Sequence, residues 1–180
     1  MVHVIEETPE HFASIRQLVT GAFAGTEFGH NGEADLVEKL RELDPSYIGL
    51  MAIDDSDVVG HVALSEAKLI RGDVEILGLG LAPMSVATAH QKRGIGTQLI
   101  QGLFDQVSES EAAFIAVAGH PEYYPRFGFE PASRFGVTHS FEGMPQEILF
   151  LKPLAEDQIE EDARLPGRLL YHAAFGPQQV

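Results

Sequence analysis

Residues 84–100 read MSVATAHQKRGIGTQLI, an apolar strand that leads into a basic, glycine-spaced turn and then into a helix. Gly94 and Gly96 let the backbone approach a ligand closely, because neither carries a Cβ. The amides of a first helical turn have no partner inside the helix, and together with the positive end of the helix dipole they favour an anion. Lys92 and Arg93 add positive charge. The stretch therefore predicts a phosphate cradle.

Two common nucleotide-binding signatures do not match this turn. The dinucleotide fingerprint needs a glycine or alanine three residues after the second glycine, where this chain has Leu99. The P-loop ends in Gly-Lys-Ser or Gly-Lys-Thr, and no such tripeptide occurs in the chain. An ordinary helix start that tolerates glycine is the alternative to any ligand-binding role.

The chain is strongly acidic, with 27 Asp and Glu against 12 Lys and Arg and a formal net charge of -15 over 180 residues. A nucleic-acid-binding domain needs a basic face that displaces counterions, so nucleic acid is not expected as a partner. The overall field favours small cationic molecules instead. No cysteine occurs, which excludes disulfides, thiolate metal sites and cysteine nucleophiles.

Length and composition predict one globular domain over residues 1–180, because 44% apolar residues can form one sizeable core. The first residues do not resemble a signal peptide, and no apolar run approaches the ~20 residues of a membrane span. We therefore expect a cytoplasmic protein without membrane contact. The sequence is compatible with a homodimer but does not decide the oligomeric state.

The hydrophobic pattern predicts an α/β fold. Strands are expected at 2–4, 47–53, 58–64, 74–81, 113–118 and 148–151, and helices from Thr8 to Gly21 or Gly25, over 36–43 and over 95–107. Pro45 should stop the second helix. Gly78 and Gly80 weaken the fourth strand and suggest a bulge or a place where a ligand or backbone comes close. The strand, turn, helix and strand after Met84 should place their two strands parallel.

A second motif follows the strand that ends at Ala118, where residues 119–129 read GHPEYYPRFGF. The pattern Gln91-x-x-Gly94-x-Gly96 resembles the acyl-coenzyme A signature of the GNAT superfamily of N-acetyltransferases. Tyr124, four residues before Gly-Phe, resembles the second landmark of that family. In looser form the resemblance covers nearly the whole chain, and the nearest subgroup consists of small bacterial-type predicted acetyltransferases.

The resemblance implies the GNAT fold, a mixed and mostly antiparallel sheet that splays at two parallel strands ending near Val86 and Ala118 and is flanked by helices. It implies acetyl-coenzyme A (acetyl-CoA) as co-substrate. One amide at the end of the first parallel strand would polarise the thioester carbonyl, and the turn amides would hold the pyrophosphate. The implied cofactor-binding residues are Met84, Ser85, Val86, Gln91, Lys92, Arg93, Gly94, Ile95, Gly96, Thr97 and His120.

His120 stands where many relatives have an Asn, so it either contacts the coenzyme, carries a proton or is a plain turn residue. Tyr124 is the implied general acid for the leaving thiolate, since a phenol with a pKa of ~10 is protonated at neutral pH. A packed aromatic is its alternative, and the adjacent Tyr123 could point inward instead. Glu75 is the candidate general base, unless its strand directs it to solvent.

The remaining candidates favour no other chemistry. His61 is predicted to be a packed histidine and His90 a surface histidine. No spacing of His, Asp or Glu indicates a metal site, and Ser85 lacks the flanking glycines of a nucleophile elbow. We therefore predict an N-acetyltransferase that acts by direct transfer from acetyl-CoA to a primary amine, with a non-catalytic acyl-CoA sensor on the same fold as the alternative. The acceptor is not encoded in any motif.

Overall fold

The structure is a computed structural model that describes residues 1–24, 32–108, 110–155, 159 and 165–178. Between the first two predicted helices the sequence also predicts a glycine-rich loop over residues 25–32, which lies outside the described residues except for Gly32. Backbone contacts divide the chain into a first unit, Met1–Leu64 with Ala82–Glu109, and a second unit, Ser65–Leu81 with Ser110–Val180. Two long strands, β3 (Asp57–Arg71) and β4 (Val74–Val86), contribute residues to both units. Each unit is described by itself.

Hydrogen bonding joins the strands in the order β1-β2-β3-β4-β5-β8-β6, and β9 pairs with both β3 and β7. The pairs β1–β2, β2–β3, β3–β9, β5–β8 and β6–β8 are antiparallel. The pairs β4–β5 and β7–β9 are parallel. The remaining strands are β1 (Val2–Glu6), β2 (Ile48–Asp54), β5 (Phe114–Ala118), β6 (Glu130–Pro131), β7 (Val137–His139), β8 (Leu149–Pro153) and β9 (Gly167–Tyr171). The predicted α/β class, with a mixed and mostly antiparallel sheet, is confirmed.

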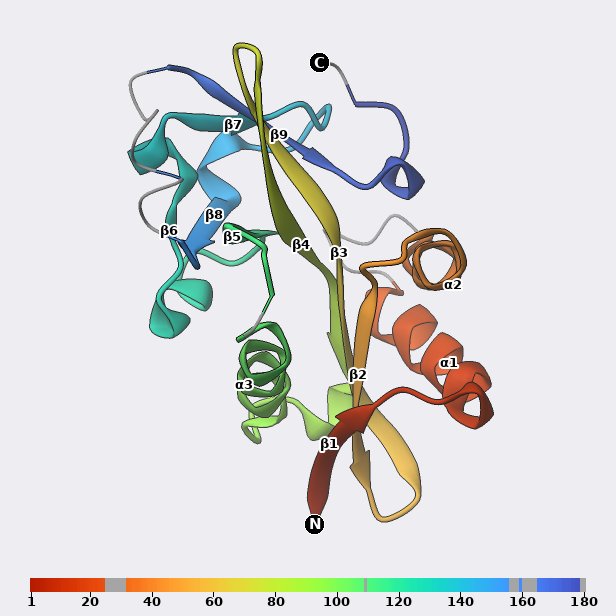
Figure 1. The fold of residues 1–180 in the computed structure, drawn as a ribbon. Coiled ribbons are helices and arrows are strands. Elements are labelled where there is room, and N and C mark those ends of the chain that lie inside the picture. The colour runs from red at the N-terminus through yellow and green to blue at the C-terminus, as the bar shows by residue number, and fades with distance from the viewer. Residues whose placement is uncertain (25–31, 109, 156–158, 160–164, 179–180) are drawn as a thin grey trace. The chain divides into compact units, whose positions relative to one another are not determined.

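In the first unit, helices cover both faces of the β1–β2 strand pair (Figure 1). The helices α1 (Phe12–Phe23) and α2 (Glu33–Leu43) lie on one face and α3 (Ile95–Val107) lies on the other. Both faces need a cover of helices because successive side chains along a strand point to opposite faces of the sheet. Met51 packs with the core of α1 and α2, whereas Leu50 approaches Gly102 of α3.

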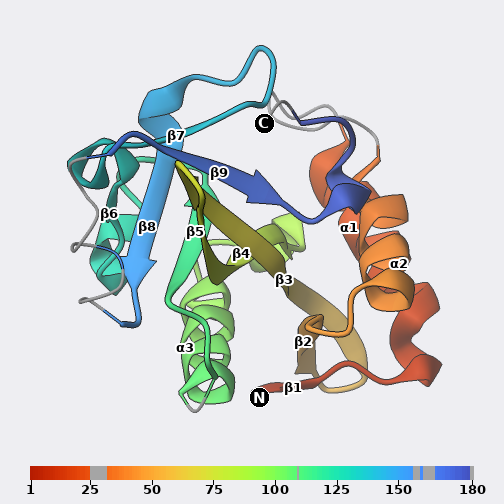
Figure 2. The same ribbon diagram turned by 45° about the horizontal axis from the view of Figure 1, so that its top comes forward.

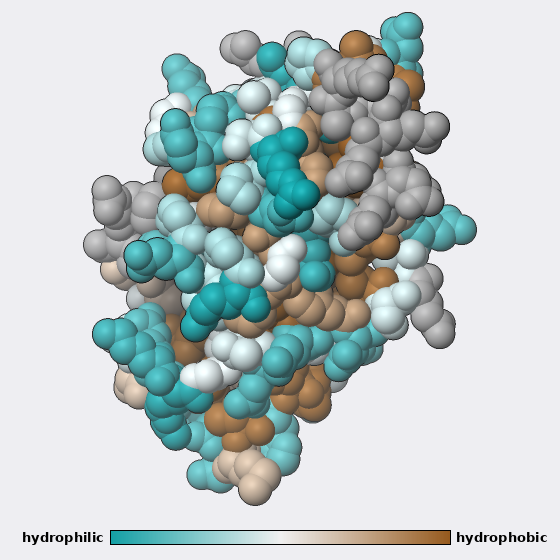
Figure 3. Space-filling view, turned by 90° about the vertical axis from the view of Figure 1, so that its left-hand side faces the viewer, coloured by the Kyte–Doolittle hydropathy of each residue, from teal (hydrophilic) through white to brown (hydrophobic). Residues whose placement is uncertain are grey.

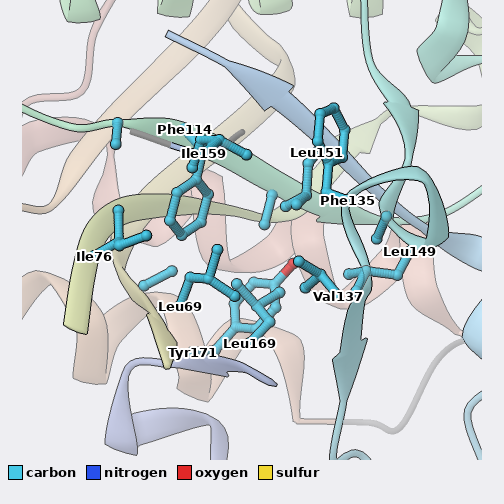
Figure 4. Close-up of a cluster of buried hydrophobic side chains, with 14 residues drawn as sticks. Leu69, Ile76, Phe114, Phe135, Val137, Leu149, Leu151, Ile159, Leu169 and Tyr171 are labelled. Carbon is cyan, nitrogen blue, oxygen red and sulfur yellow. The ribbon is translucent and has the colours of Figure 1, made fainter. Parts of the chain in front are cut away.

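The second unit has its own apolar core, drawn in Figure 4, to which β3, β4, β5, β7, β8 and β9 contribute. Figure 2 shows β9 beside β3, and the two strands pair from Ala67–Tyr171 to Ile70–Arg168. At Gly78 and Gly80 the close approach is made by side chains and not by a ligand or backbone, since the Phe114 ring occupies the space of a Cβ at Gly78 and the Tyr171 ring does so at Gly80.

The predicted elements are correct in type, but several strands are longer than expected. β4 continues without a break to Val86, although the pattern suggested an end near Leu81. The strands β6, β7 and β9 were not predicted; β6 and β7 have only two and three residues, which carry no periodicity. α2 ends at Leu43, just before Pro45, as predicted.

Hydrophilic and hydrophobic residues are intermixed on the molecular face shown in Figure 3. Within the described residues, no helix has the length and the apolar content needed to cross a membrane.

Candidate active site

The predicted phosphate cradle lies in the first unit, at the start of α3. Gly94 is the N-cap of α3 with φ +84°, and Lys92 also has a positive φ of +61°. No side chain caps the helix, and within the described part of the chain the amides of 92–97 donate to no other protein group. A Cβ at Gly94 would meet no atom within 4 Å. The turn is therefore open and presents unpaired donors, as an anion site requires.

The turn is fixed to the strands of its own unit. Gln91 Nε2 donates to the carbonyl oxygen of Val86 at 3.2 Å, which connects the turn to the end of β4. The backbone of Gly60 in β3 leaves room for two α3 side chains, since a Cβ there would lie 2.9 Å from Ile95 and 3.0 Å from Leu99. These contacts hold the amides of the turn in place before any ligand binds.

The basic residues of the turn are exposed. Arg93 Nη2 lies 3.8 Å from Asp54 Oδ2, and His90 Nε2 lies 4.0 Å from the same oxygen. With 54% of its side chain exposed, Arg93 forms a weak ion pair that a phosphate can replace. His90, predicted at the surface, is only partly exposed.

The end of β4 supplies the other implied coenzyme contacts. Met84 and Val86 are partly buried, whereas Ser85 is buried. The hydroxyl of Ser85 has no hydrogen-bond partner among the described residues. The expected backbone role of these three residues stays a prediction.

Tyr124 lies in the second unit, in a short 3-10 turn after β5, and only 7% of it is exposed. Its ring makes edge contacts with Tyr123 and Phe129, at centroid distances of 5.2 and 5.7 Å. It also lies over the backbone of Gly119, where a Cβ would overlap it. Burial, with a smaller contribution from Tyr123, raises the pKa of Tyr124, so the phenol keeps its proton at neutral pH.

The other two candidates of the second unit are exposed. Glu75 is the second residue of β4; its carboxylate lies 2.9 Å from Lys68 Nζ and its side chain is 48% exposed. This placement corresponds to the solvent-facing alternative. His120 is exposed in the turn that follows β5.

A buried polar cluster in the first unit was missed by the sequence analysis. Glu7 accepts hydrogen bonds from Arg41 Nε at 2.6 Å and Arg41 Nη2 at 3.1 Å, and its Oε2 lies 2.8 Å from His61 Nε2. His61 is fully buried, as predicted. The three residues are far apart in sequence, so a carboxylate at the end of a strand and a histidine within an apolar strand were the only signals.

Glu7→Gln is expected to lower the free energy of unfolding by about 3 kcal/mol at neutral pH. Burial raises the pKa of Glu7, but hydrogen bonds from His61 and Arg41 outweigh burial and bring it to about 2. The unfolded pKa is about 4.3. Because the folded pKa is lower, this contribution is complete above about pH 5 and is lost as the pH falls toward about 2.

Urea denaturation of both proteins across that pH range measures the difference. The exposed neighbour Glu6 provides the control, and Glu6→Gln should leave the pH dependence unchanged. Equal curves for the wild type and Glu7→Gln would contradict the stabilising role of the cluster.

No group of His, Asp or Glu among the described residues could hold a metal ion.

Comparison with known proteins gives consistent results. Residues 3–132 match the family model described as an acetyltransferase (GNAT) domain. The chain is 31% identical over 149 residues to the uncharacterized N-acetyltransferase YhbS of Escherichia coli, covering 82% of this chain and 86% of the relative. The crystal structure of E. coli YhbS in complex with CoA has a TM-score of 0.81 at 28% identity, covering 97% of this chain and 91% of that one.

A GNAT family acetyltransferase from Brucella melitensis, crystallised in complex with acetyl-CoA, has a TM-score of 0.77 at 29% identity. The match covers 98% of this chain and 99% of that one. The extent of the family match and the identity to YhbS together show that the chain belongs to the GNAT acetyltransferase family.

Proposed function

We propose that this protein transfers the acetyl group of acetyl-CoA to a primary amine, directly and in a ternary complex. The observation that carries the proposal is the open turn 92–97, whose amides have no partner in the described structure. Similar proteins from E. coli and B. melitensis were crystallised with CoA and acetyl-CoA, which supports the same donor here. The chain has no cysteine, so a thioester acyl-enzyme is excluded.

The proposed roles follow the chemistry of acetyl transfer. The amides of the turn and the side chains of Lys92 and Arg93 hold the pyrophosphate, and Gly94 permits its close approach. An amide of 84–86 polarises the thioester carbonyl and stabilises the negative charge that develops on its oxygen. Tyr124 gives its proton to the departing thiolate. His120 is proposed to contact the coenzyme.

Glu75 is the proton acceptor proposed from the sequence. Its ion pair with Lys68 has to open for this role, because Lys68 Nζ lies 2.9 Å from the carboxylate oxygen Oε1.

The proposed acceptor is a small cationic amine, because the net charge of -15 attracts cations. The single domain, the cytoplasmic location and the homodimer stay predictions.

The proposal is tested by release of free CoA thiol from acetyl-CoA in the presence of a panel of amines: spermidine, an aminoglycoside, free amino acids and a peptide with a free N-terminus. Amine-dependent thiol release is expected for at least one acceptor. Calorimetric titration with acetyl-CoA provides the binding control. Binding of acetyl-CoA without amine-dependent release of thiol would favour the non-catalytic acyl-CoA sensor. If acetyl-CoA does not bind even at millimolar concentration, the proposal that it is the acetyl donor is also wrong.

A further inference from the structure

The buried cluster of the first unit fixes the protonation of one histidine. Arg41 binds both carboxylate oxygens of Glu7, and its guanidinium carbon lies 3.6 Å from the centroid of the Phe12 ring. An ionised carboxylate can only accept hydrogen bonds, so His61 Nε2 carries the hydrogen toward Glu7. In the neutral ring, Nδ1 of His61 is then a bare acceptor.

Nδ1 of His61 has no partner. The ring is 0% exposed, and no donor among the described residues reaches this nitrogen. Buried polar atoms without a hydrogen bond are rare in native proteins, and each needs an explanation. A second atom of this kind is the hydroxyl of Ser85, which is a donor without an acceptor.

His61 and Ser85 lie on adjacent, hydrogen-bonded segments of the first unit. Ala87 N donates to Val59 O at 2.9 Å, and each of the two residues lies two positions from this bond, His61 in β3 and Ser85 in β4. A bare acceptor and a free donor therefore occupy neighbouring strands, and no hydrogen bond joins them in this structure. Ser85 also belongs to the stretch 84–86 that is proposed to hold the thioester.

We infer that His61 accepts the proton of the amine substrate through the hydroxyl of Ser85, with Glu7 and Arg41 as positioning residues. The inference rests on the proposed amine acetylation. Once the Ser85 side chain turns so that its hydroxyl lies within hydrogen-bond distance of both the amine and His61 Nδ1, the acceptor ammonium gives a proton to Ser85 Oγ while the proton of that hydroxyl moves to His61 Nδ1. The nitrogen lone pair is then free to attack the thioester. The positive charge passes to the imidazolium, whose Nε2–H faces Glu7, and the imidazolium later returns the proton to water.

Glu7 contacts His61, and two further charged or titratable groups, Arg41 and Tyr47, lie beside Glu7. Glu7 comes from the end of β1, Arg41 from α2, and Tyr47 from the segment before β2. Burial raises the pKa of Tyr47, so this phenol remains neutral and does not compete for the proton.

The test compares His61→Gln with the wild type and with His3→Gln, a change of an exposed histidine in the same unit. Glutamine keeps a donor for Glu7 but supplies no basic nitrogen. With spermidine near pH 7, kcat/KM of His61→Gln is expected to fall about 100-fold. This deficit should shrink to less than about 10-fold near pH 10, where the amine loses its own proton. It should also shrink at neutral pH with trifluoroethylamine, which is already uncharged.

A merely structural role would lower activity equally at every pH and for every amine, and that result would overturn the inference. Calorimetric binding of acetyl-CoA shows whether His61→Gln is folded. Nitrogen NMR of wild-type His61 gives an independent reading, with Nε2 protonated and Nδ1 bare; a protonated Nδ1 at neutral pH would overturn the inference too.

Two further outcomes separate the proposals. If Glu75→Gln shows the deficit that disappears at high pH and His61→Gln does not, the proton acceptor is Glu75 and the inference is wrong. If the wild type releases no thiol with any amine, the proposed function fails, and the inference fails with it. If the wild type acetylates amines and His61→Gln has the same kcat/KM for charged and for uncharged amines as the wild type, the inference is wrong but the proposed function stands.

Discussion

Gly94→Glu is expected to abolish binding of acetyl-CoA, with a loss of affinity of at least about 100-fold. Two effects combine. Gly94 has φ +84°, which costs a residue with a Cβ about 1–2 kcal/mol. The new side chain projects into the open space in front of the turn, where its carboxylate occupies the unpaired amides and repels the phosphates. Calorimetric titration measures the affinity directly.

Gly72→Glu is the matched control for this change. Gly72 also has a positive φ, of +56°, and a Cβ there likewise meets no atom within 4 Å. It lies in the turn between β3 and β4 and outside the cradle. The two variants share backbone strain and added charge, so only Gly94→Glu should lose the ligand. Gly94→Ala separates strain from charge and should weaken binding by about 10-fold. Equal binding by the two glutamate variants would remove the turn from the ligand site.

The cradle could be predicted from sequence because its geometry is local. Gly94 and Gly96 stand within one turn of a helix whose apolar stripe is plain, and the structure places the positive φ and the open amides at this turn. A close approach at Gly78 and Gly80 was also foreseeable, although a ligand or backbone was expected there and the structure has side-chain rings. The rings that take this space come from β5 and β9, and no local pattern could name them.

The cluster around Glu7 shows why contacts between residues that are far apart in the sequence were not predicted. Glu7 and His61 are 54 residues apart, and Glu7 and Arg41 are 34 apart. Their pairing depends on how β1, β3 and α2 pack, which alternation and helical spacing do not specify. A single sequence also cannot decide which face of a strand is covered. Glu75 illustrates this, because its strand is buried over much of its length and yet its carboxylate reaches solvent and Lys68.

Tyr124→Phe is expected to lower kcat by about 100-fold and to leave the affinity for acetyl-CoA within about threefold of the wild type. The change removes one hydroxyl from a ring that packs against Tyr123, Phe129 and the backbone of Gly119, so the packing should persist. If the phenol protonates the departing thiolate, its loss affects the transition state and not the binding of the ground state. Steady-state kinetics combined with calorimetry separates the two effects.

Tyr123→Phe is the control, because this neighbouring tyrosine is more exposed and does not match the family's landmark. It should retain wild-type turnover. The pH profile provides a further check: the pKa of Tyr124 is raised, so the wild-type rate should not fall between about pH 7 and 9 through loss of this proton. Unchanged turnover in Tyr124→Phe would identify Tyr124 as a packed aromatic. The thiolate would then have to leave unprotonated or take its proton from another group.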